Sequence, residues 1–291
     1  MLVLGLFVRW TERREKNGLD PLFRLGLFDI NPLRGGLQMF LAQNIILMGV
    51  FFSIPLYLQV VQGLDALETG LKMLPVSVTM FVMSFVGARM SQRRTPQWIV
   101  RVGLWILLGA IVVLIGTIEP SLEGYAFGLS MALLGVGMGL LASQLGNVVQ
   151  SSVEPADRSE AGGLQYTSQQ LGSSLGTALI GAVVLSVLAT GFFNQLNSDP
   201  RISDSLAAEI SADLAEGVEF VNADDVRVAL EENGTLSDDE VDAIVETLEE
   251  SELTALRTGL LVAAFVVIGA LFMVRRIPDM SFEEIAAAEA D

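Results

Sequence analysis

Long apolar stretches alternate along the chain with short polar segments and one long acidic segment. A helix needs about 20 mostly apolar residues to cross the hydrocarbon core of a bilayer. Six stretches meet this requirement: residues 36–59, 69–90, 98–118, 124–150, 164–190 and 255–274. The pattern therefore predicts an all-α membrane protein with six full transmembrane helices.

A shorter apolar segment covers residues 1–8 and stops at Arg9. Eight helical residues extend over only about 12 Å, which is too short to cross a bilayer. No small-residue cleavage site follows, so a signal peptide is the weaker interpretation. We interpret residues 1–8 as the end of a truncated seventh transmembrane helix.

Basic residues indicate the orientation of the spans. Of the 17 lysines and arginines, 13 fall in segments that six spans would place on one side of the membrane. The exceptions are Lys72, Arg201, Arg227 and Arg257. By the positive-inside rule, the basic side is cytoplasmic and the C-terminus lies inside, in a multi-pass protein of the cell membrane.

The expected order of segments follows from the spans and their orientation. It is the helix end at 1–8, a cytoplasmic link at 9–35, five spans within 36–190, an acidic extracytoplasmic loop at 191–254, the last span within 255–275, and a cytoplasmic tail at 276–291.

The net charge of −17 belongs mainly to the acidic loop at 191–254. This loop holds 18 acidic residues against two arginines, and it has a helical pattern of its own. Ser237 and Glu240 form a capping-box pattern before an apolar stripe, and Leu206 and Ile210 suggest a second helix. We expect a solvated cap without catalytic groups.

Composition excludes several classes of function. The chain has no cysteine and no histidine, so thiol chemistry, Cys/His zinc sites and His-dependent catalysis are absent. No basic stripe exists that would neutralise nucleic-acid phosphates. We therefore expect no enzyme, no metal site, no cofactor and no nucleic-acid partner.

The centres of the spans lack Asp, Glu, Lys and Arg but contain amides. Amides are costly in lipid unless they pair with another polar group or face water. Two alternatives stay open: the amides line a polar cavity, or they join helices by hydrogen bonds. The substrate-cavity candidates are Gln43, Asn44, Gln144, Asn147, Gln165 and Gln169.

Small residues are spaced for close helix contact. Gly135 and Gly139 form one G-x-x-x-G pair, and Gly172 and Gly176 form another. Without a Cβ atom, neighbouring backbones approach closely, which is how membrane helices gain dispersion contact. We predict that these four glycines are helix-packing positions.

Several motifs resemble a known family when taken in order. They are RWTERR at 9–14 with DPL at 20–22, IPLYLQ at 54–59, GVGMG at 135–139, and QQLG at 169–172 before LGTA at 175–178. The pattern resembles the major facilitator superfamily, in particular its fourteen-span drug:proton antiporters of the EmrB/QacA type. The resemblance implies that this chain is the C-terminal half of a two-half transporter.

The resemblance favours a proton-coupled multidrug or small-molecule efflux transporter that works by alternating access. Its expected partners are the lipid bilayer, a missing N-terminal half, a small lipophilic substrate and protons. One alternative is a transporter of the same fold for another metabolite or an organic anion. Another is a non-transporting membrane scaffold.

Overall fold

The computed structural model describes Arg9, Arg13, residues 24–119, 125–213, 220–233 and 236–277, and Asp279. Over these residues the structure is helical and contains no strand. Six helices are long and apolar enough to cross a membrane, as the hydrophobic pattern predicted. The helix end predicted at residues 1–8 lies outside the described residues, as do about half of the predicted link and most of the predicted tail.

Four of the long helices, α2 to α5, begin and end within five residues of the predicted spans, whereas α6 and α9 are longer than predicted. Their bounds are α2 Asn31–Leu56, α3 Ala66–Met90, α4 Pro96–Ile115, α5 Ala126–Ser151, α6 Arg158–Leu196 and α9 Asp238–Met273. Shorter elements are η1 (Leu25–Asp29), the π-helical turn η2 (Tyr57–Val61), η3 (Pro155–Asp157), α7 (Asp204–Asp213), α8 (Ala223–Asn233) and η4 (Val274–Arg276).

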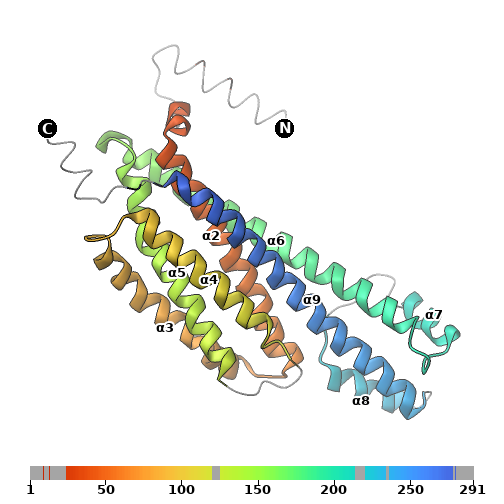
Figure 1. Cartoon of the computed structure of the whole chain (residues 1–291). Coiled ribbons are helices and arrows are strands. Elements are labelled where there is room, and N and C mark those ends of the chain that lie inside the picture. Colours follow the sequence, from red (N-terminus) through yellow and green to blue (C-terminus); the bar gives the residue numbers. More distant parts are fainter. Residues whose placement is uncertain are drawn as a thin grey trace.

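The six long helices form two layers (Figure 1). In the inner layer α5 packs against α3 and α2, and α2 packs against α6. In the outer layer α4 packs on α5, and α9 packs on α2, α4 and α6. Helix α3 contacts mainly α5, so it is the least covered of the six.

Close backbone contacts hold the inner layer together. A Cβ atom built on Gly135, Gly139, Gly172 or Gly176 would lie 2.2, 2.6, 2.5 or 2.6 Å, respectively, from a carbonyl oxygen of the neighbouring helix. Side chains cannot be accommodated at such distances without moving the backbones apart. The first pair faces α3 and the second pair faces α2, so the geometry supports the proposed packing role of these four glycines.

Helices α6 and α9 continue beyond the length that a bilayer requires. At 1.5 Å per residue, the 39 residues of α6 extend over about 58 Å, against a hydrocarbon core of about 30 Å. The capping box at Ser237 and Glu240 is present, and it begins α9 itself rather than a separate loop helix. Helix α7 covers the positions of Leu206 and Ile210.

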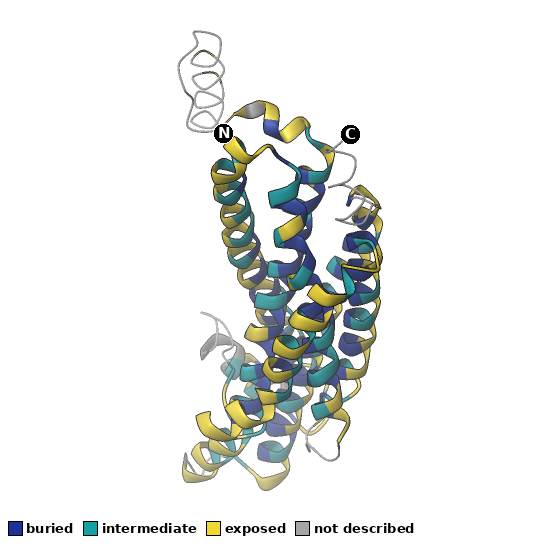
Figure 2. Cartoon of the chain, turned by 90° about the vertical axis from the view of Figure 1, so that its left-hand side faces the viewer, coloured by how far each residue is buried: buried dark blue, intermediate teal, exposed yellow. Residues whose placement is uncertain are grey.

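We call residues 191–213, 220–233 and 236–254 the outer cap. It consists of the projecting ends of α6 and α9 with α7 and α8, and it lies at the end of the bundle opposite η1 and η4 (Figure 1). Figure 2 shows that buried residues gather toward the middle of the bundle, with exposed residues along its outside.

Candidate functional site: an amide-lined pocket

A pocket of about 330 Å³ opens on the inner layer, between α2, α5 and α6. It is lined by Phe40, Gln43, Asn44, Leu47, Ala142, Gly146, Gln165 and Gln169. Four of the six predicted cavity candidates therefore lie together, although they come from two helices more than 100 residues apart in the sequence.

Three of these amides have no hydrogen-bond partner among the described residues: Gln43, Gln165 and Gln169. Gln43 is 6% exposed, and the two glutamines of α6 are half-buried. Asn44 differs, because its Nδ2 donates to the Phe40 carbonyl oxygen at 2.9 Å. The pocket thus presents free amide donors and acceptors beside apolar walls.

The remaining two candidates lie elsewhere. Gln144 is buried between α5 and α3, where its Nε2 donates to the Gly87 carbonyl oxygen at 2.9 Å and to Ser143 Oγ at 3.0 Å. This contact fits the alternative of an interhelical hydrogen bond. Asn147 is exposed on α5 and does not line the pocket.

None of the described residues that line the pocket is charged. Among the described residues, no group of three or more histidine, cysteine, aspartate or glutamate side chains is placed to hold a metal ion. Such a pocket provides van der Waals contact and hydrogen bonds but no fixed charge, which suits neutral or lipophilic molecules of many shapes.

A polar network at the cap end of the bundle was not predicted from the sequence. Tyr57 on η2 donates to the Glu119 carbonyl oxygen at 2.8 Å, and Gln62 Nε2 donates to the same oxygen at 2.9 Å. Arg257 on α9 donates to the Ile118 carbonyl oxygen at 3.1 Å. These bonds join α2, the end of α4, and α9 on the side where the cap lies.

The cap is also bonded to the outer end of α2. Asn222 Nδ2 donates to the Val60 carbonyl oxygen at 2.9 Å. The neighbouring Val221 N–H donates to Glu252 Oε1 at 3.2 Å, so residues 221–222 bridge α9 and α2. The cap is therefore attached to the same helix that supplies Gln43 and Asn44 to the pocket.

Glu252 is fully buried in the cap, with its Oε2 atom unpaired. Along α9 it lies five residues, or about 7.5 Å, closer to the cap end than Arg257. Arg257 itself bonds to the carbonyl oxygen of Ile118, just after the end of α4. Burial raises the pKa of this carboxyl to about 8, because desolvation disfavours the charged form. Its spacing of four residues from buried Leu248 and from buried Leu256 was the sequence signal for burial.

Comparison with known proteins identifies the family. The family model of the Major Facilitator Superfamily matches residues 1–177, which reach from the N-terminus into α6. The tetracenomycin C resistance and export protein of Streptomyces glaucescens is 30% identical over 205 residues, covering 70% of this chain and 38% of that protein. The multidrug efflux pump LfrA of Mycolicibacterium smegmatis is 25% identical, covering 78% of this chain and 45% of that pump.

The fold agrees with this assignment. A bacterial homologue of the human lysosomal transporter Spinster, solved in an inward-facing and occupied conformation, aligns with a TM-score of 0.53 at 18% identity. The alignment covers 88% of this chain and 50% of that structure. The chain spans about half the length of these three proteins, or less. With the family match over more than half of its residues, this chain belongs to the Major Facilitator Superfamily.

Proposed function

We propose that this chain is the C-terminal half of a proton-coupled efflux transporter for small, lipophilic molecules, of the fourteen-span type, working by alternating access. The observation that carries the proposal is the amide-lined pocket on the inner layer. Relatives named for antibiotic resistance and multidrug efflux support the substrate class. The absence of cationic side chains from the pocket favours this substrate class over organic anions.

The missing N-terminal half is the proposed partner of the inner layer. Helix α3 exposes a row of large apolar side chains that no described residue covers: Leu67, Leu71, Leu74, Val78, Phe81, Val82, Phe85 and Val86. In two-half transporters the substrate site lies at the interface of the halves. A second half packed on α3 and α6 would enclose the amide-lined pocket. The carboxylate that couples transport to protons would come from that half, because none of the described residues that line this pocket is charged.

We further propose that the cap is extracytoplasmic and the C-terminus cytoplasmic, in the cell membrane. The division of basic residues supports this orientation. With the substitutions Ser205→Cys and Ser281→Cys made separately, an impermeant thiol reagent applied to intact cells should label only the first variant. Labelling of the second variant alone would overturn the orientation.

The pocket is tested by measuring drug accumulation. The chain is joined behind the N-terminal half of the S. glaucescens relative and expressed in a bacterium that lacks its own efflux pumps. The double substitution Gln165→Ala/Gln169→Ala should raise the accumulation of a lipophilic dye toward that of cells without the transporter. The control Gln170→Ala changes an exposed amide on α6 outside the pocket, and it should leave accumulation unchanged.

Two results would contradict the proposed pocket: unchanged accumulation in the double variant, or an equal rise in the control. A dye gradient that survives a protonophore would contradict proton coupling.

A further inference from the structure

The outer layer contains a second hollow that the proposed transport cycle does not use. It is a groove of about 630 Å³ between α4 and α9, at the end of the bundle where the arginines gather. Its principal lining residues are Arg101, Trp105, Leu108, Ile268, Phe272 and Arg275. It lies on the layer opposite the amide-lined pocket, away from the face proposed to meet the second half.

Both sides of the groove carry an arginine followed by an aromatic side chain. Along α4, Arg101 is followed one turn deeper by Trp105. On the other side of the groove the order repeats in the antiparallel direction, with Arg275 on η4, which follows α9, and Phe272 one turn deeper on α9. Aliphatic side chains continue both stripes. The groove is therefore cationic at the basic end of the bundle and apolar toward the middle of the bilayer.

Neither arginine has a partner in the described part of the chain. The four ion pairs there use Arg24, Arg201 and Arg227, and no hydrogen bond joins Arg101 or Arg275 to a protein group. A guanidinium near a bilayer surface is best stabilised by an anion, and a phosphate accepts from it in bidentate geometry.

The apolar part of the groove is equally open. Trp105 is 59% exposed and Phe272 is 76% exposed, at positions that α5, α2 and α6 leave uncovered. A free phosphate ion would satisfy the arginines and leave this wall empty, whereas an acyl chain would cover it. Basic pockets between transmembrane helices on the cytoplasmic side are suited to anionic lipid headgroups.

We propose that this groove is a binding site for an anionic phospholipid of the leaflet at the basic end of the bundle. Arg101 and Arg275 hold the headgroup phosphate between them, and one acyl chain lies along Trp105 and Phe272. The site is specific for a negatively charged headgroup, because the described residues that line the groove include two arginines and no carboxylate.

The proposal is tested by quenching of a single tryptophan. The chain has three tryptophans, so Trp10→Phe and Trp98→Phe leave Trp105 alone. The purified protein is reconstituted in bilayers that contain a rising mole fraction of either brominated phosphatidylglycerol or brominated phosphatidylcholine. Phosphatidylglycerol should quench Trp105 at a mole fraction about tenfold lower, since a charge-assisted hydrogen bond of about 1.5–3 kcal/mol corresponds to tenfold or more in affinity.

Charge variants separate a site from general attraction to an anionic surface. Arg101→Gln/Arg275→Gln should remove the preference for phosphatidylglycerol, and the conservative Arg101→Lys/Arg275→Lys should retain part of it. The matched control Arg89→Gln/Arg93→Gln removes the same charge from exposed positions outside the groove and should keep the preference. Circular dichroism confirms that each variant keeps its helix content.

Several outcomes would overturn the proposal. Equal quenching by the two lipids means that no headgroup is selected, and a loss in the control equal to that in the groove variant means that only surface charge acts. Relief of quenching by inorganic phosphate would assign the arginines to a free anion. Absence of quenching by either lipid would mean that a protein segment covers the groove.

Discussion

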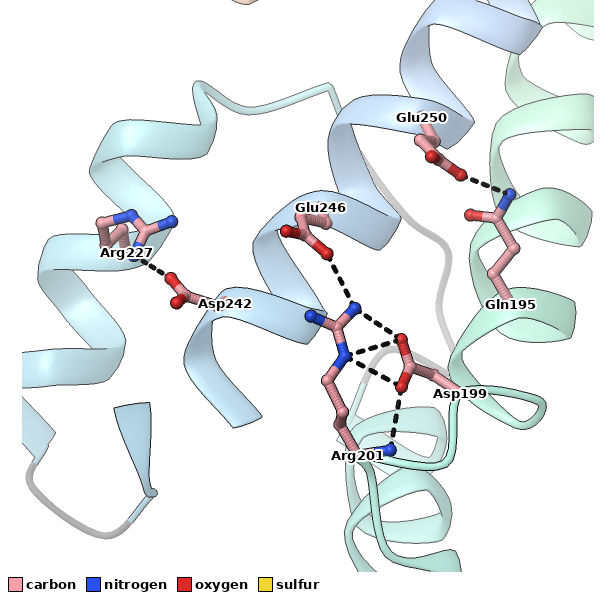
Figure 3. A network of polar contacts seen from close by, with 7 residues as sticks. All are labelled: Gln195, Asp199, Arg201, Arg227, Asp242, Glu246 and Glu250. Carbon is pink, nitrogen blue, oxygen red and sulfur yellow. Dashed lines mark hydrogen bonds and ion pairs between the residues drawn. The ribbon is translucent and has the colours of Figure 1, made fainter. Parts of the chain in front are cut away.

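Helices α6 and α9 are built differently inside the bundle and in the outer cap. Within the bundle their closest contacts involve glycines: a Cβ atom on Gly176 would lie 2.6 Å from the Ile45 carbonyl oxygen, and one on Gly259 would lie 2.5 Å from Val184 Cγ2. In the cap the same two helices also bury apolar side chains, among them Leu196 and Leu248. Polar side chains join them there as well, as Figure 3 shows for Gln195 and Glu250.

The difference follows from the solvent around each part. Lipid gives no hydrophobic force between helices, so contact there depends on backbone approach and dispersion. We expect water around the cap, where Arg201 pairs with Asp199 at 2.8 Å and with Glu246 at 2.7 Å, and Arg227 pairs with Asp242 (Figure 3). Exposed ion pairs are individually weak. We therefore expect packing defects in the bundle to be far more damaging than lost charges in the cap.

The largest expected effect is that of Gly176→Leu. The new side chain would meet the backbone of α2 and force α2 and α6 apart, which typically costs about 1–3 kcal/mol or more in a packed interior. Folded yield and the thermal midpoint in detergent should both fall. The control Gly163→Leu lies on the same helix with nothing within 4 Å of its Cβ position, and it should behave as the wild type. Normal yield and midpoint in Gly176→Leu would mean that the contact is not close.

Glu252 should make the stability of the folded chain depend on pH. Unlike the exposed charged side chains of the cap, it is buried. Its pKa is about 8 in the folded chain against an ordinary value of 4.5, so between these values the folded protein holds a proton that the unfolded chain has released. Stability should therefore fall as pH rises through this window. Burial also raises the pKa of Glu249, in the same direction, and no histidine titrates there.

The substitution Glu252→Gln should flatten this dependence of the thermal midpoint between pH 5 and pH 9. The amide keeps an acceptor for the Val221 N–H without an ionisable group. Glu232→Gln, which changes an exposed carboxylate on α8, should leave the slope as it is in the wild type. If the slopes of the wild type and Glu252→Gln coincide, the buried carboxyl is not the group that titrates.

The smallest effect is expected from Arg201→Gln. Arg201 joins the turn after α6 to α9 through the half-buried Asp199 and the exposed Glu246, and a hydrogen bond from Arg201 lowers the pKa of Asp199. The thermal midpoint should fall slightly in dilute buffer. That difference should vanish near 1 M salt, where the Debye length is about 3 Å. A drop as large as that of Gly176→Leu would remove the distinction between the two regions.

The six spans were predictable because each is a continuous apolar stretch of bilayer length. The start of α9 was also predictable, since Ser237 and Glu240 carry a local signal that acts within one helical turn. The identity of the family followed from motifs whose order and spacing are linear in the sequence, and the family match confirmed it.

The division of the amides was not predictable. Whether Gln43 faces a pocket and Gln144 faces α3 depends on how each helix is rotated in the bundle, and near-uniform hydrophobicity does not specify that rotation. The continuation of α6 and α9 into the cap was missed for a related reason. Hydropathy marks the edge of the lipid, whereas a helix ends only where its backbone hydrogen bonds end.

The central claim, that this chain is one half of a transporter whose pocket is completed by a second half, is tested most directly in liposomes with a proton gradient. The purified chain is reconstituted alone or together with a separately produced N-terminal half, and gradient-dependent movement of a lipophilic dye is measured. The account predicts no such movement with the chain alone and protonophore-sensitive movement when both halves are present. Robust gradient-dependent movement with the chain alone would contradict it.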